Sequence, residues 1–341
     1  MKTKDQLNKK KNRKRTIIIT LTIIVVLILG VIYLYNNMTN YEKLNFKDLG
    51  INENNNDQNK INKSKFVNIA IFGVDSRANT WTGLSDTIIV ATLDYENKQI
   101  KLSSFMRDSL VYIEGHGYEK QTHAYSYGNA QLAVKTLNTN YDLDIQEYVT
   151  INFNGLEKVV NKLGGVKIEI KSYEISEINK IINNLNSLNG NKVELITQSG
   201  EQLLNGRQTV AYARIRKVGN GDEQRTQRQR EVIEKIINKI QNLNYQEALS
   251  LANEFMPYVK TSFSLSDSLN KAKDFNFFKT ATVLEFKYPD TYKFATVNKS
   301  SVVKPDTLET NVIKLHQFIY NIEQYMVSDK VIELSTEINK K

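Results

Sequence analysis

The sequence contains no cysteine, three prolines, three histidines and one tryptophan among its 341 residues. The absence of cysteine excludes disulfides, cysteine-ligated zinc sites and thiol catalysis, and it gives no positive sign of a cellular compartment. Three signatures are also missing: the Gly-x-x-x-x-Gly-Lys-Ser/Thr phosphate loop, the Gly-x-Ser-x-Gly nucleophile elbow and the His-Glu-x-x-His zinc helix. We therefore look for the chemistry of this chain among its acidic and basic residues.

A broad basic surface is missing as well, although the net charge is +9. Residues 1–15 hold eight Lys and Arg against Asp5 alone, which accounts for +7, so the remaining 326 residues carry only +2. A nearly neutral body lacks the electrostatic footprint of a nucleic-acid-binding protein. We therefore expect no nucleic-acid partner, and the basic tail needs another explanation.

An uncharged run of twenty residues, mostly Ile, Leu and Val, follows the basic tail at 16–35. It is long enough to cross a hydrocarbon core of about 30 Å as a helix. Basic residues before the run, and none directly after it, place the N-terminus in the cytoplasm. A cleaved signal peptide is the alternative, but the bulky residues at 31–35 offer no small-x-small cleavage site. The sequence predicts a single-pass anchor in the cell membrane with an extracellular domain.

Residues 36–64 contain ten Asn in 29 positions and predict a solvated linker. Beyond it, short apolar runs predict strands, and amphipathic stretches predict helices between them. The strands are expected at 66–72, 87–93, 99–104, 146–152, 166–170, 280–286 and 292–297, and the helices at 128–139, 154–163, 173–187, 201–212 and 223–243. This alternation predicts an α/β fold: one layered α-β-α domain at 65–325 with a central mixed sheet. Residues 326–341 are expected to form a C-terminal tail.

The placement of arginine is the most informative feature of the composition. The chain has 36 Lys but ten Arg, and six of the ten lie in one window of 24 residues, at 207, 214, 216, 225, 228 and 230. The guanidinium group binds phosphate with two parallel hydrogen bonds, which Lys cannot do. The window therefore favours an anion site, although a solvated helix face is the alternative, above all for Arg207 and Arg230.

The spacing of these arginines supports an anion site. Arg214 and Arg216 are two residues apart, so an extended segment would direct both to one side. Arg225 and Arg228 are three apart and would be neighbours on a helix. Between the pairs, the loop 217–222 leads to a helix N-terminus, which itself favours anions. Asp222 stands where a helix cap belongs, so capping competes with a catalytic role for this residue.

Two carboxylates frame the loop that follows the first strand. Asp75 comes directly after that strand, and Asp86 precedes the second strand. Such oxygen ligands at strand ends suit a hard cation such as Mg²⁺, while an ordinary Asp turn is the alternative for each. Arg107 and Asp108 follow the third strand and would lie near the same rim, either as part of the site or as a simple salt bridge. Together, carboxylates and arginines are what phosphoryl transfer requires.

Eight short motifs occur in an order that resembles the LytR-CpsA-Psr family. They are Gly-Val-Asp-Ser-Arg at 73–77, Ser-Asp-Thr at 85–87, Arg-Asp at 107–108, His-Ala-Tyr at 123–125, Leu-Gly-Gly-Val at 163–166, Tyr-Ala-Arg-Ile-Arg at 212–216, Asp222, and Arg225 with Arg228-Gln229. The resemblance runs from about residue 66 to residue 320. No single motif is specific, but their order is.

The resemblance implies an extracellular phosphotransferase. Its donor would be a glycan, such as teichoic acid or capsular polysaccharide, on a polyprenyl-pyrophosphate carrier, and its acceptor a sugar hydroxyl of peptidoglycan. The carrier's polyprenyl tail would lie in an apolar pocket between sheet and helices. By motif position, the metal ligands for Mg²⁺, with Mn²⁺ as the alternative, would be Asp75 and Asp86. The catalytic residues would be Arg107, Asp108, Asp222 and Arg77, with Asp222 a candidate general base. The pyrophosphate would be bound by Arg107, Arg214, Arg216, Arg225, Arg228 and Gln229.

Two positions depart from the family pattern, and other functions stay open. Leu84 stands where the family often has Arg, and Gly128-Asn129 stands where it often has Gly-Gly. A membrane-anchored binder of lipid-linked polymer would use the same arginines but would leave the paired carboxylates unexplained. A hydrolase that uses water as acceptor is a second alternative. A transcriptional attenuator is a third, and the nearly neutral body and the predicted anchor argue against it. His123 is expected to make structural hydrogen bonds or to contact a ligand.

Overall fold

A six-stranded mixed sheet forms the centre of the molecule in a computed structural model that describes residues 41–52, 61–75, 81–190, 192–262 and 277–341. Neighbouring strands of this sheet pair antiparallel, except that β10 is parallel to β3 and β1 is parallel to β6. The order across the sheet is β10 (Thr282–Tyr288), β3 (Gln99–Phe105), β2 (Ser85–Asp94), β1 (Phe66–Val74), β6 (Glu147–Asn152) and β9 (Val259–Thr261). The predicted central mixed sheet is confirmed.

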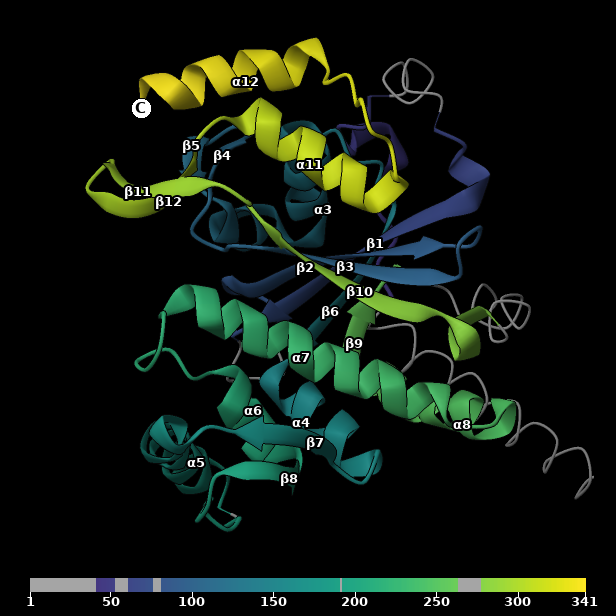
Figure 1. Ribbon diagram of the computed structural model, residues 1–341, viewed down its shortest axis with the longest axis vertical. Coiled ribbons are helices and arrows are strands. Elements are labelled where there is room, and N and C mark those ends of the chain that lie inside the picture. Colours follow the sequence, from purple (N-terminus) through teal and green to yellow (C-terminus); the bar gives the residue numbers. More distant parts are fainter. Residues whose placement is uncertain (1–40, 53–60, 76–80, 191, 263–276) are drawn as a thin grey trace, which may run out of the picture.

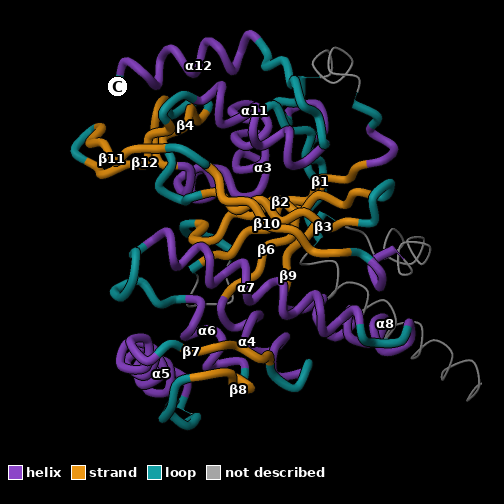
Figure 2. The backbone as a smooth tube through the Cα atoms, viewed as in Figure 1, coloured by secondary structure: helices purple, strands orange, loops and turns teal. Residues whose placement is uncertain are grey.

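Helices cover both faces of this sheet, as Figures 1 and 2 show. On one face lie α3 (Gln121–Tyr141), α11 (Leu308–Tyr320) and α12 (Asp329–Lys340), and on the other α4 (Phe153–Lys162), α6 (Gly206–Ala213), α7 (Asp222–Gln241) and α8 (Tyr245–Phe255). Strand β2 explains why both faces are covered. Its Ile88 and Val90 belong to the core under α3, whereas Ile89 and Ala91 belong to a second core under α7. Because successive side chains of a strand point to opposite faces, an apolar run must be buried on both.

Three two-stranded sheets extend the domain. They are β4 (Leu110–Ile113) with β5 (Gly117–Lys120), β7 (Val166–Ile170) with β8 (Gly200–Leu204), and β11 (Tyr292–Val297) with β12 (Ser300–Pro305). The β7–β8 pair packs with α5 (Ile175–Asn189) around a third core. The predicted helix at 201–212 was wrong in its first part, because these residues begin as β8, paired with β7, before α6 starts at Gly206. The single-turn helices η1 (Phe46–Asp48), η2 (Lys63–Lys65), η3 (Ser172–Glu174) and η4 (Met256–Tyr258) complete the described elements.

The predicted C-terminal tail at 326–341 was wrong. Residues 329–340 form α12, which is capped by the Ser328 side chain. Val331, Leu334 and Ile338 are three and four residues apart, so they share one helical face, and all three are buried in the main core. The apolar residues of this segment are few, and the pattern was too sparse to stand out from the sequence. The domain therefore includes its last helix.

The predicted linker at 36–64 was wrong in part, because residues 41–52 pack on the domain. Leu44 and Leu49 are buried in the main core. The Gln131 side chain of α3 bonds the backbone of Asn45 and Asp48, and the Asn138 side chain donates to the carbonyl of Leu49 at 2.9 Å. These side chains satisfy the backbone of an otherwise irregular segment. Two leucines five positions apart gave no periodic signal in the sequence.

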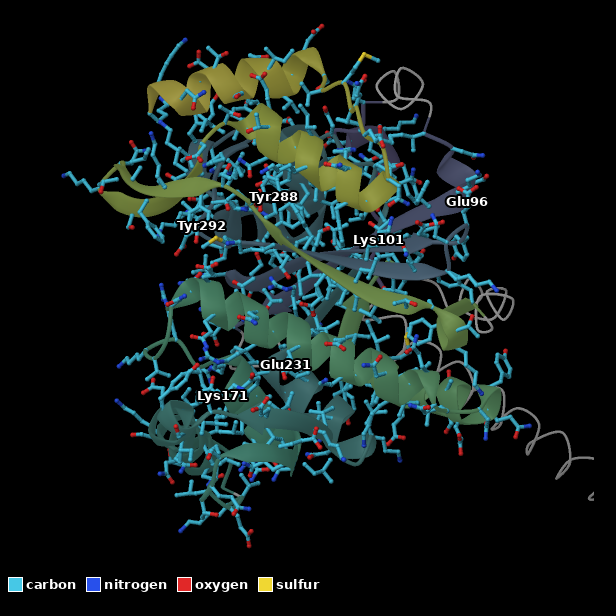
Figure 3. The ribbon with its side chains drawn as sticks, in the orientation of Figure 1. Glu96, Lys101, Lys171, Glu231, Tyr288 and Tyr292 are labelled. Carbon is cyan, nitrogen blue, oxygen red and sulfur yellow. The ribbon has the colours of Figure 1, made fainter. Side chains whose placement is uncertain are left out.

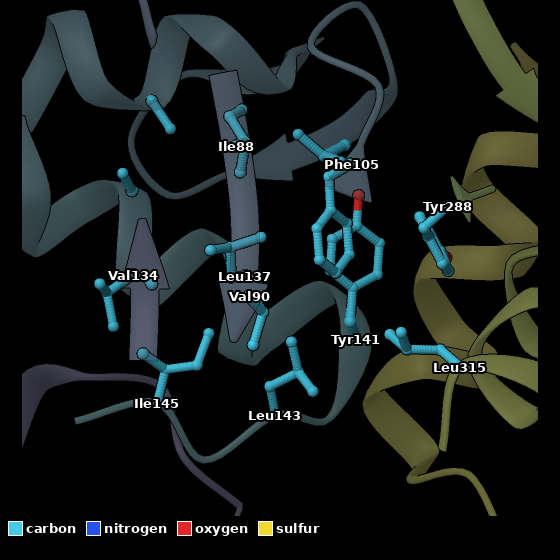
Figure 4. Packing of buried hydrophobic residues seen from close by; sticks show 14 of the residues in the cluster. Ile88, Val90, Phe105, Val134, Leu137, Tyr141, Leu143, Ile145, Tyr288 and Leu315 are labelled. Carbon is cyan, nitrogen blue, oxygen red and sulfur yellow. The ribbon is translucent and has the colours of Figure 1, made fainter. Parts of the chain in front are cut away.

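Three aromatic rings support the turn that follows β3. Phe105, Tyr141 and Tyr288 pack with ring centroids 4.6–5.0 Å apart (Figure 4). The amide of Met106 donates to the carbonyl of Tyr288 at 2.9 Å, and the Tyr141 hydroxyl bonds the Gln121 side chain at the start of α3. Rings from β3, α3 and β10 thus fix the position of residues 106–108.

The predicted basic tail at 1–15 and membrane span at 16–35 lie outside the described residues. Within the described ranges, no helix has both the length and the apolar character needed to cross a membrane.

A strained residue kinks helix α3. Asn129 has φ 51° and ψ −151°, close to a region that only glycine occupies readily, and Gly128 beside it is also non-helical. Such a backbone costs about 1–3 kcal/mol for a residue with a side chain. We expect Asn129→Gly to raise the melting temperature of the full chain by roughly 2 °C and Asn129→Ala to lower it, measured by thermal denaturation. An Asn129→Ala variant as stable as the wild type would show that the position is not strained.

The buried His316 makes stability depend on pH. Its Nε2 lies 2.8 Å from the carbonyl oxygen of Tyr141, its ring stacks on Tyr325, and burial lowers its pKa from 6.5 to about 4. The folded chain thus keeps this imidazole neutral, whereas the unfolded chain protonates it below pH 6.5. Stability contributed in this way is present above pH 6.5 and is lost as the pH falls toward 4.

We expect the free energy of unfolding to fall by about 2 kcal/mol between pH 7 and pH 5 because of this residue alone. Urea denaturation of wild type and His316→Gln at both pH values measures the effect. The difference in stability between the two chains should narrow at pH 5. A constant difference would refute the assignment.

Candidate functional site

Seven charged side chains meet at the edge of the sheet where β3 ends and β2 begins. We call them the charged cluster, and they comprise four cations and three carboxylates: Arg107, Lys120, Arg216, Arg225, Asp86, Asp108 and Asp222. Residues up to 139 positions apart in the chain, from Asp86 to Arg225, are brought together here. Cations outnumber carboxylates, which leaves the charged cluster with a net positive charge.

The antiparallel pairing of β2 and β3 brings Asp86 to Arg107. The register joins Ile89 to Ser104, and continued by three residues it places Asp86 opposite Arg107. Nη1 of Arg107 donates to Oδ1 of Asp86 at 2.5 Å. The N-terminus of α3 holds the same turn from the other side, because the Thr122 amide donates to the carbonyl of Arg107 at 2.9 Å. Arg107 is therefore fixed by both backbone and side chain.

The first turn of α7 supplies the opposite wall of the charged cluster. Nη2 of Arg225 lies 2.8 Å from Oδ1 of Asp222, and its Nη1 lies 3.8 Å from Asp86. Gly221 precedes the helix with φ 60°, a left-handed conformation that glycine adopts readily. The helix cap is thus Gly221, and the alternative that Asp222 caps α7 with its side chain was wrong. The carboxylate of Asp222 instead contacts arginines.

Asp108, Lys120 and Arg216 complete the charged cluster. Asp108 lies 3.3 Å from Nζ of Lys120 and 4.0 Å from Nη2 of Arg216. Nε of Arg216 lies 3.2 Å from Oδ1 of Asp222, and the Arg216 side chain is 50% exposed. By contrast, Arg225 is only 7% exposed. The charged cluster therefore opens to solvent on the Arg216 side and is closed on the Arg225 side.

Burial and charge compete at the two central arginines. Burial lowers the pKa of Arg107, but the carboxylates of Asp86, Asp108 and Asp222 outweigh it and raise the pKa above its ordinary value. Burial also lowers the pKa of Arg225, and there the carboxylates do not outweigh it. Nε of Arg107 and Nε of Arg225 are buried and make no hydrogen bond within the described part of the chain, whereas Nη2 of Arg225 faces Asp222. The two Nε donors are available to an anion.

An apolar cavity lies directly behind the charged cluster, between the sheet and the helices α4, α6 and α7. Its lining continues from the cluster, since Thr87 follows Asp86 and Gln229 lies one helical turn after Arg225. The remaining wall is mostly hydrophobic and is formed by Ile71, Gly73, Val74, Ile151, Asn152, Phe153, Leu156, Ala213, Val232 and Ile233. Charged side chains next to an apolar cavity suit a ligand that has both a charged part and an apolar part.

Some predicted pyrophosphate ligands do not join the charged cluster. Arg214 lies over the ring of Phe153, 4.5 Å from its centroid, and among the described residues it makes no ion pair with the carboxylates of the charged cluster. Arg228 is only 2% exposed and pairs with Glu174 at 2.7 Å, so it connects α7 to η3. Gln229 lines the apolar cavity and approaches the carbonyl of Ala213 at 3.5 Å. Arg225 and Arg228 are three residues apart on α7, but Arg225 pairs with Asp222 and Arg228 pairs with Glu174.

The two predicted metal ligands lie at the same sheet edge. Asp75 follows β1 and is exposed, and its amide donates to the carbonyl of Leu84 at 3.3 Å, two residues before Asp86. Among the described residues no group of three or more Asp, Glu or His could hold a metal ion. Mg²⁺ is commonly held by one or two carboxylates together with substrate phosphates, so a cation held here would draw further ligands from a bound substrate. Arg77, a predicted catalytic residue, lies outside the described residues.

His123 and Lys120 lie at the junction of β5 and α3. Nδ1 of His123 is 3.2 Å from Glu119, which agrees with a structural role. Lys120 was missed from the sequence, although it contacts Asp108 directly. A single lysine in a chain with 36 of them carries no signal, and only the fold brings this one to the charged cluster.

Comparison with known proteins identifies relatives of this chain. The family model described as the LytR_cpsA_psr family matches residues 30–318. The polyisoprenyl-teichoic acid–peptidoglycan teichoic acid transferase TagT of Bacillus subtilis (strain 168) is 34% identical over 206 residues, which cover 59% of this chain and 61% of TagT. The corresponding transferase TagU of Enterococcus faecalis (strain ATCC 700802 / V583) is 35% identical over 227 residues, covering 64% and 68%.

A solved structure of TagT bound to LIIa-WTA has a TM-score of 0.61 with 28% identity and covers 75% of this chain and 90% of that one. The central mixed sheet, the order of the motifs and the family model therefore agree. The chain belongs to the LytR-CpsA-Psr family.

Proposed function

We propose that this chain is a phosphotransferase that moves a glycopolymer from a polyprenyl-pyrophosphate carrier to peptidoglycan. The polymer is a teichoic acid or a related anionic wall polysaccharide, and it becomes attached through a phosphodiester to a sugar hydroxyl. The predicted N-terminal span would anchor the chain in the cell membrane and place the charged cluster outside the cell.

The observation that carries this proposal is the pair of buried arginines at the mouth of the apolar cavity. Arg107 and Arg225 have buried donors without hydrogen bonds among the described residues. The phosphate oxygens of a pyrophosphate would accept from these donors with charge-assisted hydrogen bonds. The apolar cavity behind them, about 60 Å³ in volume, would take only the first part of the polyprenyl chain attached to the pyrophosphate. A soluble nucleotide would have no use for that apolar interior.

Relatives support the substrate class. The TagT and TagU relatives carry the name of teichoic acid transferases that act on peptidoglycan, and a solved relative is described as bound to LIIa-WTA. The match covers 61% of TagT, so the transfer of this activity to the present chain is part of the proposal.

The reaction is a displacement at the phosphorus that carries the polymer. The acceptor hydroxyl attacks that phosphorus, a new P–O bond forms, and the bond to the polyprenyl phosphate breaks. Polyprenyl phosphate leaves, and Arg107 and Arg225 stabilise the negative charge on the transferred and leaving phosphates. Asp222, which contacts three arginines at 2.8–3.9 Å, would accept the hydroxyl proton. Arg216, at the exposed side, would guide the anionic donor inward.

Mg²⁺, or Mn²⁺ in its place, would be held by Asp75 and Asp86 and would neutralise pyrophosphate charge when bound. Asp86 also accepts from Arg107, so this carboxylate would orient both the cation and the arginine.

We expect Arg225→Lys to lower kcat by roughly 10²- to 10³-fold, because one ammonium cannot replace the forked donors at a buried site. The full chain in detergent would be incubated with a polyprenyl-pyrophosphate-linked saccharide and peptidoglycan fragments, and the phosphodiester product measured by mass spectrometry. Arg230→Lys is the matched control on the same helix, because Arg230 pairs with Glu285 outside the charged cluster. Donor binding without product from the wild type would favour a non-catalytic binder, and release of polyprenyl phosphate without product would favour a hydrolase.

Removal of divalent cations should abolish product formation, and Asp75→Asn should raise the Mg²⁺ concentration for half-maximal activity by about tenfold. The same assay with a chelator and a Mg²⁺ titration measures both effects. Asp290→Asn serves as control, because Asp290 is an exposed carboxylate paired with Lys314. Full activity in the chelator would remove the metal from the mechanism.

A further inference from the structure

The β11–β12 hairpin, residues 292–305, is attached to one wall of the charged cluster. The amide of Val303 donates to the carbonyl of Asp108 at 2.8 Å, and Val303 also bridges to Ser109. The backbone of β12 therefore continues the turn that carries Arg107 and Asp108. A displacement of the hairpin would displace this turn as well.

The same hairpin is attached to the opposite wall. The hydroxyl of Tyr292 donates to Oε2 of Glu223 at 3.1 Å, and Nζ of Lys287 donates to Oε1 of the same carboxylate at 2.7 Å. Glu223 directly follows Asp222 in the first turn of α7. Figure 3 shows Tyr292 between the hairpin and α7. The hairpin thus spans from Asp108 to the neighbour of Asp222 and forms a rim of the charged cluster.

One face of this rim presents an exposed aromatic ring. Successive side chains of β11 alternate, so Phe294 shares a face with Tyr292, whereas Ala295 and Val297 pack on the main core. The rings of Tyr292 and Phe294 are 5.7 Å apart at 85°. Phe294 is 70% exposed, the highest value among the large hydrophobic side chains that the structure describes. The core does not bury this ring, which leaves it able to contact a ligand at the rim.

We propose that the face formed by Tyr292 and Phe294 binds the acceptor saccharide of peptidoglycan, an inference that rests on the proposed transferase function. The reacting hydroxyl must reach the charged cluster, so the neighbouring sugars must lie on its rim. The C–H groups on one face of a pyranose carry partial positive charge and pack on the negative face of an aromatic ring. Phe294 supplies this ring beside the Tyr292 hydroxyl, which can bond a sugar.

Charge on the hairpin agrees with this occupant. Residues 292–305 contain three Lys and neither Asp nor Glu. Lys293 lies on the opposite face of β11 from Phe294, but Lys299, between β11 and β12, is exposed. The peptide stems of peptidoglycan carry carboxylates, which the ammonium group of Lys299 would attract. A bilayer surface would require a wider apolar face than two rings provide. The rim therefore suits an anionic saccharide better than a lipid surface.

The test is direct binding of a peptidoglycan tetrasaccharide with peptide stems to the full chain in detergent, by isothermal titration calorimetry. We expect Phe294→Ala to weaken binding roughly five- to tenfold and Phe294→Tyr to restore it, because the ring and not the residue identity is required. The matched control is Tyr245→Ala, an exposed aromatic residue at the start of α8, beyond the far end of α7, which itself rises about 30 Å from Asp222. Affinity for the polyprenyl-pyrophosphate donor should be the same in all four chains.

Equal saccharide affinity of wild type and Phe294→Ala, or no saccharide binding by the wild type, would overturn the proposal. So would a Phe294→Ala variant that loses binding to phosphatidylglycerol vesicles or changes its oligomeric state while it keeps saccharide affinity. Saccharide binding that depends on Phe294, in a sample that forms no phosphodiester product, would support the rim as a saccharide site and remove the transferase proposal. The two proposals thus fail by different observations.

Discussion

Buried guanidinium groups need negative charge close to them, and this need organises the whole site. An ion removed from water without a partner costs several kcal/mol, so Arg107 and Arg225 are stable only beside carboxylates. Asp86 and Asp222 fill this role in the described structure. A pyrophosphate would compete with them for the same donors. Once phosphate oxygens take over Arg225, Asp222 has an oxygen free to accept the acceptor's proton. The ion pairs of the site and the proposed chemistry therefore depend on the same contacts.

The fold must hold these contacts in place against their own repulsion. The turn after β3 is fixed by three aromatic rings beneath it, by the start of α3 on one side and by β12 on another. The start of α7 is fixed to the hairpin through Glu223 and to η3 through the buried pair of Arg228 and Glu174. Each support comes from a different part of the chain. Rigid supports of this kind keep catalytic groups in a productive arrangement without a cost at each turnover.

Much of this arrangement could be predicted from the sequence, because strands with continuous apolar runs and motifs in a fixed order carry a strong signal. The central sheet and the approach of Asp86, Arg107 and Asp222 followed from these features. Lys120, the packed segment at 41–52 and helix α12 could not be predicted. Lys120 is one of many lysines, the segment 41–52 shows only two isolated leucines, and α12 shows only three spaced apolar residues. In each case tertiary contacts, and not local periodicity, fix the structure. Arg214 caps the end of α6, so the extended geometry that its spacing from Arg216 suggested does not hold at this residue, and its predicted contact with pyrophosphate stays a prediction.

The arginine window also shows why a residue type must be interpreted through its partners. In this lysine-rich chain Arg207, Arg225, Arg228 and Arg230 are all buried. The chain therefore uses arginine mainly where a positively charged side chain is removed from water. A guanidinium suits burial because it keeps its charge and has five donors to distribute. Arg207, Arg228 and Arg230 each pair with a glutamate, which balances their charge. Arg225 belongs instead to a group of four cations and three carboxylates at the mouth of an apolar cavity. Excess positive charge at an opening, rather than arginine itself, therefore distinguishes a phosphate site from a structural ion pair.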